Sequence, residues 1–230
     1  MFSDILTTIL STTILSTIII NYILFNLIYY TSSLFFFIID YYKYFAQYKI
    51  QHIHNPIQYY KKCFWRVITN TLLFSLVPIS LFAWYEVKVL NLNSHFNLTK
   101  CIFDLVYSLI LTEIFFYSIH RLLHLPYIYA YFHKEHHKII APIGFAAVYM
   151  TVTDFLVGNV LPVYLPLYLI NAHSITIKIW MVLTTINTVV FSHSGYYLSR
   201  FHDAHHSLFN KNYGTNLFMD WIFGTLQKIE

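Results

Sequence analysis

Charged residues are scarce in this 230-residue chain, in which Lys, Arg, Asp and Glu together make up 10%. Soluble domains carry about 25% charged residues, so 14 basic and 10 acidic side chains could not cover a water-facing surface. This lack of charge excludes a soluble globular protein. The 57% hydrophobic content and the mean hydropathy of +0.55 exclude a disordered chain. The composition indicates a membrane protein.

Cysteine and glycine are also rare, with two and five residues respectively. Cys63 and Cys101 allow at most one disulfide and build no CxxC metal site. The sequence contains no glycine-rich phosphate loop, and its basic residues are spread out despite the net charge of +4. Nucleic-acid binding is therefore not expected.

Long uncharged runs are abundant and predict five membrane crossings. The run between Asp4 and Asp40 would form roughly 52 Å of helix, more than the ~30 Å hydrocarbon core, so we expect one tilted span with an interfacial continuation. The other four runs are Val67–Tyr85, about Ile102–Ile119, Phe155–Ile177 and Ile179–Ser199. Lys178 separates the last two, and a turn is expected at residues 171–174.

The segment Tyr41–Arg66 carries five basic residues, no acidic residue and many tyrosines. Basic and aromatic residues together are typical of the cytosolic membrane interface. We expect an all-α integral membrane bundle of about four to five transmembrane helices. Residues 1–100 would form its N-terminal anchor helices and this basic interfacial segment.

Histidine is in clear surplus, because nine of the 13 histidines lie in three short groups. The groups are HRLLH, HKEHH and HSGYYLSRFHDAHH, and the nine residues are His120, His124, His133, His136, His137, His193, His202, His205 and His206. One H-x-x-H-H triplet would arise by chance about 0.04 times in such a chain, and this chain has two. Residues at i, i+3 and i+4 share one face of a helix, so these spacings predict platforms of metal ligands.

Eight or nine imidazoles exceed what one ion requires, which favours two metals. Imidazole suits iron, zinc, copper and nickel alike, so the ligand type does not select the metal. The 55 residues between His137 and His193 contain two apolar runs, and a helical hairpin there would return the third group to the side of the first two. Nearby basic residues indicate that this side is cytosolic. A nitrogen-only dimetal site without a nucleophile or phosphate cradle favours oxygen chemistry on a lipid C–H bond.

The remaining polar residues have more ordinary interpretations. Glu113 lies seven residues before His120 on the same helix face and is expected to accept an imidazole N–H. Asp203 and Glu135 would either orient neighbouring imidazoles or face water. A structural or solvated role is expected for the other histidines and for a C-terminal group of residues: His52, His54, His95, His173, Asn212, Tyr213, Gly214 and Asp220.

The blocks HRLLH, HKEHHKIIAPIGFAAVY, HSGY, FHDAHH and NYGTNLFMDWIFGT, in this order, resemble the fatty acid hydroxylase and sterol desaturase superfamily. HSGY followed by HDxHH, NYG and D-x-x-FGT is most similar to its methylsterol monooxygenase branch. The resemblance covers about Leu105 to Leu226. The spacing of eight residues between His193 and His202 is shorter than in the animal sterol oxidases, and Tyr197 stands where some hydroxylases carry a further histidine.

The resemblance implies a multi-pass enzyme of the endoplasmic reticulum membrane that holds two iron ions and consumes O2. Zinc is a further possibility for the protein as purified. Electrons would come from NAD(P)H through a separate haem carrier and reductase. Residues 101–230 would form the fatty acid hydroxylase-like catalytic domain, with a cytosolic histidine-rich cap that holds two metal ions. The nine clustered histidines would be the metal ligands, with Glu113 and Asp154 at the acidic positions of the family. The substrate would be a lipid, foremost a sterol-like one.

Two alternatives remain open at the level of sequence. The same ligands serve hydroxylases or desaturases of fatty acids, sphingolipids or alkanes, which differ in the shape of the lipid cavity. A histidine-rich metal transporter or metal-binding membrane protein would place its ligands near the middle of the bilayer. The sequence does not define the oligomeric state.

Overall fold

The computed structural model describes residues 2–51, 56–89 and 95–227. Helices dominate these residues, and the only β-structure among them is one isolated bridge. The helices are α1 (Phe2–Tyr41), α2 (Pro56–Ile68), α3 (Leu76–Lys88), α4 (Leu98–Leu123), α5 (Pro126–Ile128), α6 (Leu161–Leu169), α7 (Ser174–Ile186), α8 (Arg200–Leu208) and α9 (Phe218–Ile222). The predicted all-α fold is confirmed.

Four helical stretches within the described residues are long and apolar enough to cross a membrane: Leu10–Tyr41, Ile57–Lys88, Leu98–Leu123 and Ser174–Ser192. The second joins α2 and α3 through a π-helical turn at Thr69–Phe74, and a π-helical turn at Asn187–Ser192 extends α7. A shorter apolar helix at Asp154–Leu169 includes α6. The expectation of about four to five membrane helices is confirmed.

The boundaries of the last two predicted spans were wrong. The first of them ends with α6 at Leu169, and the next begins with α7 at Ser174, so the chain turns at residues 170–173, one residue earlier than the predicted turn at 171–174. Lys178 lies inside α7 instead of dividing the spans. It can do so because its Nζ donates to Glu86 Oε2 at 2.7 Å, which pairs the charge.

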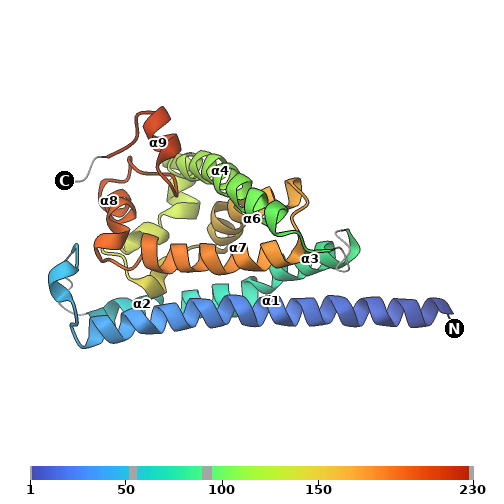
Figure 1. Cartoon of the computed structure of the whole chain (residues 1–230). Coiled ribbons are helices and arrows are strands. Elements are labelled where there is room, and N and C mark those ends of the chain that lie inside the picture. Colours follow the sequence, from blue (N-terminus) through green and yellow to red (C-terminus); the bar gives the residue numbers. More distant parts are fainter. Residues whose placement is uncertain (1, 52–55, 90–94, 228–230) are drawn as a thin grey trace.

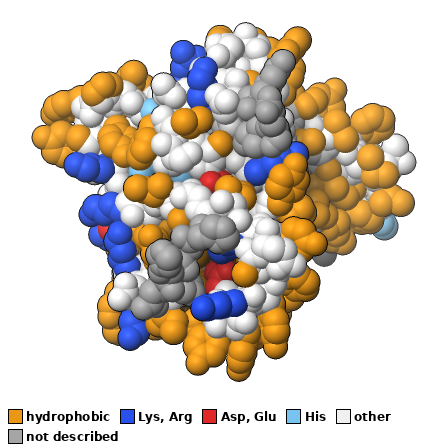
Figure 2. Space-filling model, turned by 90° about the vertical axis from the view of Figure 1, so that its left-hand side faces the viewer, with side chains coloured by type: hydrophobic (Ala, Val, Ile, Leu, Met, Phe, Trp, Pro, Cys, Tyr) orange, Lys and Arg blue, Asp and Glu red, His pale blue; other side chains and the backbone are white. Residues whose placement is uncertain are grey.

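The helices bring distant parts of the chain to one end of the molecule. In Figure 1, α1 lies along one side of the bundle, where it packs against α3 and α7, while α4 packs against α6. The C-terminal end of α1, α8 and α9 all lie at the end opposite the N-terminus. Figure 2 views this end: Lys and Arg side chains are spread over its face, and hydrophobic side chains surround it.

A buried polar cluster ties α1, α3 and α7 together. Glu86 on α3 is fully buried, and its carboxylate accepts hydrogen bonds from Asn21 of α1 at 2.9 Å and from Lys178 and Ser174 of α7. A charge inside an apolar bundle is tolerated when its partners satisfy it. The cluster therefore fixes the three helices relative to one another.

We expect Lys178→Met to destabilise the bundle. The substitution leaves Glu86 buried without its cation, and breaking a buried pair costs about 3–5 kcal/mol of stability. We expect a loss near the lower value, because 25% of the Lys178 side chain is exposed. Thermal unfolding in detergent measures the loss. The double change Lys178→Met with Glu86→Leu should recover part of it; an unchanged melting temperature in the single variant would contradict this account.

Candidate metal centre

The nine predicted histidines come together in two adjacent groups. The five-histidine group consists of His120, His124, His133, His137 and His205, and the four-histidine group of His136, His193, His202 and His206. Within each group, one ring nitrogen per residue lies within 4.8 Å of every other. Seven of the nine side chains are buried, and the other two are partly buried. Each group therefore has the dimensions of a metal site.

Each H-x-x-H-H motif contributes to both groups. His133 and His137 belong to the five-histidine group, whereas His136 between them belongs to the other. On α8 the pattern is reversed, because His202 and His206 lie in the four-histidine group and His205 in the five-histidine group. The triplet spacing thus couples the two groups through each of the two motifs.

The local structure of the second motif differs from the prediction. His133 ends a π-helical turn, Tyr129–His133, and His136 begins a 3-10 turn, His136–Lys138, so HKEHH does not lie on a regular α-helix. His120 lies in the last turn of α4, and His124 is its C-cap residue. α8 is the one regular helix that carries a full triplet.

The outer nitrogens of five imidazoles make hydrogen bonds that fix their tautomer. The acceptors are Tyr213 O for His120 at 2.7 Å, Asp154 Oδ2 for His133 at 2.7 Å, Tyr149 O for His136 at 3.2 Å, Thr188 O for His193 at 2.8 Å and Lys211 O for His205 at 2.7 Å. Carbonyl and carboxylate oxygens only accept, so Nδ1 carries the proton in each ring. In a neutral imidazole, Nε2 then has no proton and carries a free lone pair.

These Nε2 atoms face one another at distances that call for a cation. His120 Nε2 lies 3.1 Å from His133 Nε2, and His193 Nε2 lies 3.3 Å from His136 Nε2. Burial lowers the pKa of His133 to about 3 and, together with the nearby His133, that of His136 to about 4, so protonation does not relieve the contact. Converging lone pairs are the ligand arrangement that a bound metal requires, and the residues fit two metal ions.

The three acidic residues expected beside the imidazoles have different roles. Asp154 accepts directly from His133. The expectation that Glu113 accepts an imidazole N–H was wrong. Glu113 lies seven positions before His120, which places it about 10.5 Å away along α4. Its carboxylate instead binds residues 215–219. Asp203 is buried and accepts from Gln51 Nε2 at 2.8 Å, not from an imidazole.

Two carboxylates hold residues 209–217, which connect α8 to α9 and are called the C-terminal loop here, against the five-histidine group. Glu113 Oε2 accepts from the backbone N–H groups of Thr215 and Asn216, each at 2.7 Å. Asp220 accepts from the N–H groups of Tyr213 at 2.9 Å and Gly214 at 2.7 Å. A Cβ at Gly214 would collide with the Glu113 carboxylate, which shows how closely the loop is held. The loop in turn presents Tyr213 O to His120.

The other polar residues lie away from the imidazole nitrogens or act structurally. Glu135 pairs with Arg66 at 3.1 Å. His95 is exposed, and His173 is the N-cap of α7, where its Nδ1 accepts from Ile175 N. The expectation for His52 and His54 lies outside the described residues. Asn212 bridges Phe201 O and Gln227 N, which is the structural role expected of it.

No pattern of side chains marks the backbone carbonyls that orient the imidazoles. Tyr149, Thr188, Lys211 and Tyr213 contribute main-chain oxygens, and any residue type can supply these. The contacts of Lys49 and Gln51 with the histidine-bearing segments were also missed.

Comparison with known proteins gives the family. The family model for fatty acid hydroxylase matches residues 105–225. Very-long-chain aldehyde decarbonylase GL1-11 of Oryza sativa subsp. indica is 30% identical over 218 residues, which cover 86% of this chain and 81% of the relative. Methylsterol monooxygenase 2-2 of Arabidopsis thaliana is 29% identical over 221 residues, with 86% and 81% covered.

A third relative is matched over a shorter region. Fatty acid hydroxylase domain-containing protein 2 of Homo sapiens is 38% identical over 127 residues, 53% of this chain and 38% of the relative. No solved structure matches. The chain belongs to the fatty acid hydroxylase family, a family of membrane-associated lipid-modifying enzymes.

We expect Glu113→Gln to loosen the C-terminal loop. An amide lacks one of the two acceptor oxygens that bind the loop N–H groups, and each unsatisfied buried group costs about 1–3 kcal/mol. Hydrogen exchange over residues 213–219 should become faster. The control is Asp104→Asn on the same helix, because Asp104 pairs with a half-exposed Lys100 and contributes less than about 1 kcal/mol. Equal exchange in both variants would refute the role of Glu113.

Proposed function

We propose that this protein is a membrane di-iron monooxygenase that oxidises a C–H bond of a lipid, foremost a methyl group of a sterol-like substrate. The supporting observation is the pair of histidine groups whose Nε2 atoms converge beside a large, mainly apolar cavity. Two iron ions held by the nine histidines would supply the O2-dependent oxidation of C–H bonds. Membership of the fatty acid hydroxylase family supports the same reaction class.

The cavity has a volume of about 390 Å³ and a polar and an apolar part. Its polar wall contains His120, His133, His136, His193, His202 and Asp154. Apolar side chains from α4, α7 and the segments that follow α7 form much of the rest, among them Phe116, Trp180 and Phe201. An apolar wall beside the imidazoles suits a lipid substrate.

Several residues that line the cavity also reach the surface of the bundle. Leu109 on α4, Leu183 on α7 and Phe191 line the cavity, and each is about half exposed. Exposed apolar side chains that also line a cavity suit a bilayer and not water. We therefore infer that the substrate enters sideways from the membrane between α4 and α7.

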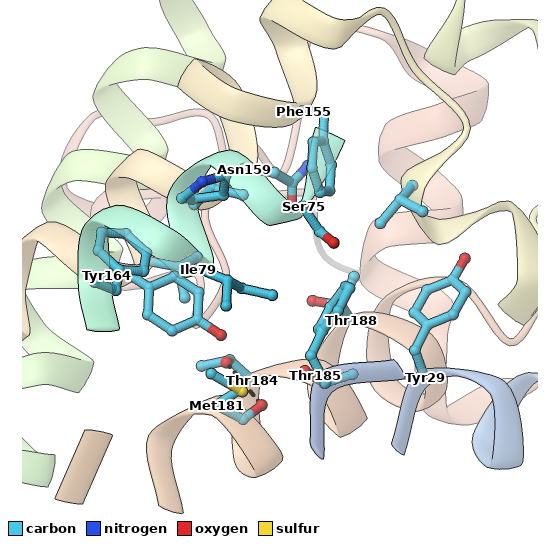
Figure 3. Close-up of a pocket in the computed structure, with 16 residues that line it drawn as sticks. Tyr29, Ser75, Ile79, Phe155, Asn159, Tyr164, Met181, Thr184, Thr185 and Thr188 are labelled. Carbon is cyan, nitrogen blue, oxygen red and sulfur yellow. Dashed lines mark hydrogen bonds between the residues drawn. The ribbon is translucent and has the colours of Figure 1, made fainter. Parts of the chain in front are cut away.

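A smaller apolar pocket of about 70 Å³ continues from the cavity. Asn159, Val163, Thr184 and Thr188 line both hollows. Figure 3 shows the pocket between α1, α3, α7 and the segment before α6, with Tyr29, Ile79 and Thr188 around it. A substrate with its reacting end at the histidines would extend its distal end toward this pocket.

The residues around the imidazoles prepare them for metal binding. Asp154 holds the His133 proton on Nδ1, and Tyr213 O does the same for His120, so both rings present Nε2. Oxidation of a lipid C–H bond by O2 requires an electron supply. We propose NAD(P)H as the source, through a separate haem carrier and reductase.

The proposed orientation follows from charge. Lys134 and Lys138 lie within and directly after the HKEHH motif, Figure 2 shows Lys and Arg side chains spread over this end of the molecule, and basic residues favour the cytosolic side. We propose a multi-pass protein of the endoplasmic reticulum membrane with its metal centre on this side.

We expect two irons per chain after anaerobic purification, and we expect His136→Ala to abolish lipid oxidation. His136 belongs to the four-histidine group and lines the cavity, so its loss removes a ligand without changing the apolar wall. Metal counting with iron spectroscopy, and lipid analysis of cells expressing either form, make the measurement. Accumulation of sterol intermediates in the variant supports the sterol substrate.

Other outcomes distinguish the alternatives. A change in acyl chains or in very-long-chain aldehydes, with normal sterols, would replace the sterol substrate by a linear one. A single exchangeable zinc per chain, moved across vesicles by the purified protein, would overturn the enzyme and favour a transporter.

We expect Thr184→Phe to select against ring-bearing substrates. Thr184 borders both hollows, so a phenyl ring there narrows their junction; a flexible acyl chain can bend past it and a rigid fused ring cannot. The expected result is a decrease of about tenfold or more in kcat/KM for a sterol, with a smaller decrease for a linear lipid. The control is Ser118→Phe, on the exposed face of α4, whose hydroxyl makes the same type of i–4 hydrogen bond. Equal losses for both substrates would contradict this view of the cavity.

A further inference from the structure

The chain that follows α1 reaches back to the histidine-bearing segments. We call residues 42–51 the linker. Lys49 in the linker donates to Asp40 Oδ1 at 2.7 Å and to Ser194 O at 3.1 Å. The side chains of Lys49 and Asp40 are only 10% and 2% exposed. This buried ion pair therefore joins the end of α1 to the residue after His193.

Main-chain contacts extend the same connection. Ile50 N donates to Gly195 O at 3.0 Å, and Lys49 forms an antiparallel bridge with Tyr196. The Lys49 Nζ also lies 4.2 Å from the centre of the Tyr196 ring, and the Tyr196 hydroxyl donates to Asp40 at 2.9 Å. The loop that follows His193 is thus held on both its backbone and its side chains.

Gln51 holds a second histidine-bearing segment. Its Nε2 donates to Asp203 Oδ1 at 2.8 Å and to Ile140 O at 3.0 Å. Asp203 follows His202 directly and lies one turn before His206 on α8. The buried Nδ1 of His206 has no hydrogen-bond partner in the part of the chain that the structure describes. The position of α8, not a bond of its own outer nitrogen, therefore sets the orientation of the His206 ring.

The two histidine groups have different supports. The linker contacts Ser194 and Asp203, which directly follow His193 and His202 of the four-histidine group. The C-terminal loop instead supplies the acceptors for His120 and His205 of the five-histidine group, Tyr213 O and Lys211 O. Each group is thus tied to a different end of the chain.

We propose that Lys49 and Gln51 are positioning residues for the four-histidine group, so that the N-terminal anchor forms part of the metal centre. This inference rests on the proposed ligation of two ions by the nine histidines. It changes the proposed division at residue 100, because residues 101–230 alone would lack the support of one metal position. Removing that support should release one ion and leave the other bound.

The experiment uses the full chain, purified in detergent and reconstituted with iron(II). We expect the iron content of the Lys49→Met variant to fall from two ions per chain to about one. A chelator should remove the ion of the four-histidine group about 10–100-fold faster than in the wild type. The iron that remains should show the spectrum of a His193→Ala variant and not that of His124→Ala. Lys49→Arg should restore most of the second iron, since it keeps the cation. Gln51→Leu should act in the same direction.

Lys178→Met is the matched control, because it breaks another lysine–carboxylate pair between helices, and neither Lys178 nor Glu86 adjoins one of the nine clustered histidines in the sequence. It should lower the melting temperature and keep both irons. The positioning role is wrong if Lys49→Met keeps two irons with an unchanged release rate, or if it loses both together. If Lys49→Met does not fold, Gln51→Leu decides by the same criteria. A wild-type protein that binds no iron would instead refute the proposed function.

Discussion

The metal centre depends on where the imidazoles place their protons. Backbone carbonyls and Asp154 accept hydrogen bonds from the Nδ1 atoms, which point away from the centre of the cluster. The Nε2 atoms, each with a lone pair, then face one another at 3.1–3.3 Å within the cluster. Without a cation this arrangement is repulsive, and burial prevents the rings from relieving it by protonation. The surrounding structure therefore has to hold these mutually repelling imidazoles in place until a cation binds.

Five buried carboxylates serve that purpose. Asp40, Glu113, Asp154, Asp203 and Asp220 are all buried, and each has a hydrogen-bond partner in a segment that carries or supports a histidine. In an apolar bundle a buried carboxylate is costly unless several donors satisfy it. Such a group therefore orders the donors around it, which is how Glu113 fixes a loop and Asp40 gathers a lysine and two tyrosines.

The supports come from both ends of the chain and meet at one end of the bundle. α1 and the linker hold the segments around His193 and α8, while the C-terminal loop accepts hydrogen bonds from His120 and His205. The family match at residues 105–225 covers the histidines but not the linker. The matched region therefore does not contain every contact that orders the imidazoles.

The sequence by itself determined the helical membrane architecture, because long uncharged runs have few other stable forms in a bilayer. It also identified the nine histidines as candidate metal ligands, because their spacing is too regular for chance. It placed Asp154 near the site, yet it misplaced Glu113 and the break at Lys178. Only the tertiary structure decided which histidines share a group, which carbonyls accept their protons and what Lys49 contacts. These features depend on main-chain atoms and on partners more than a hundred residues away, neither of which a local pattern of side chains encodes.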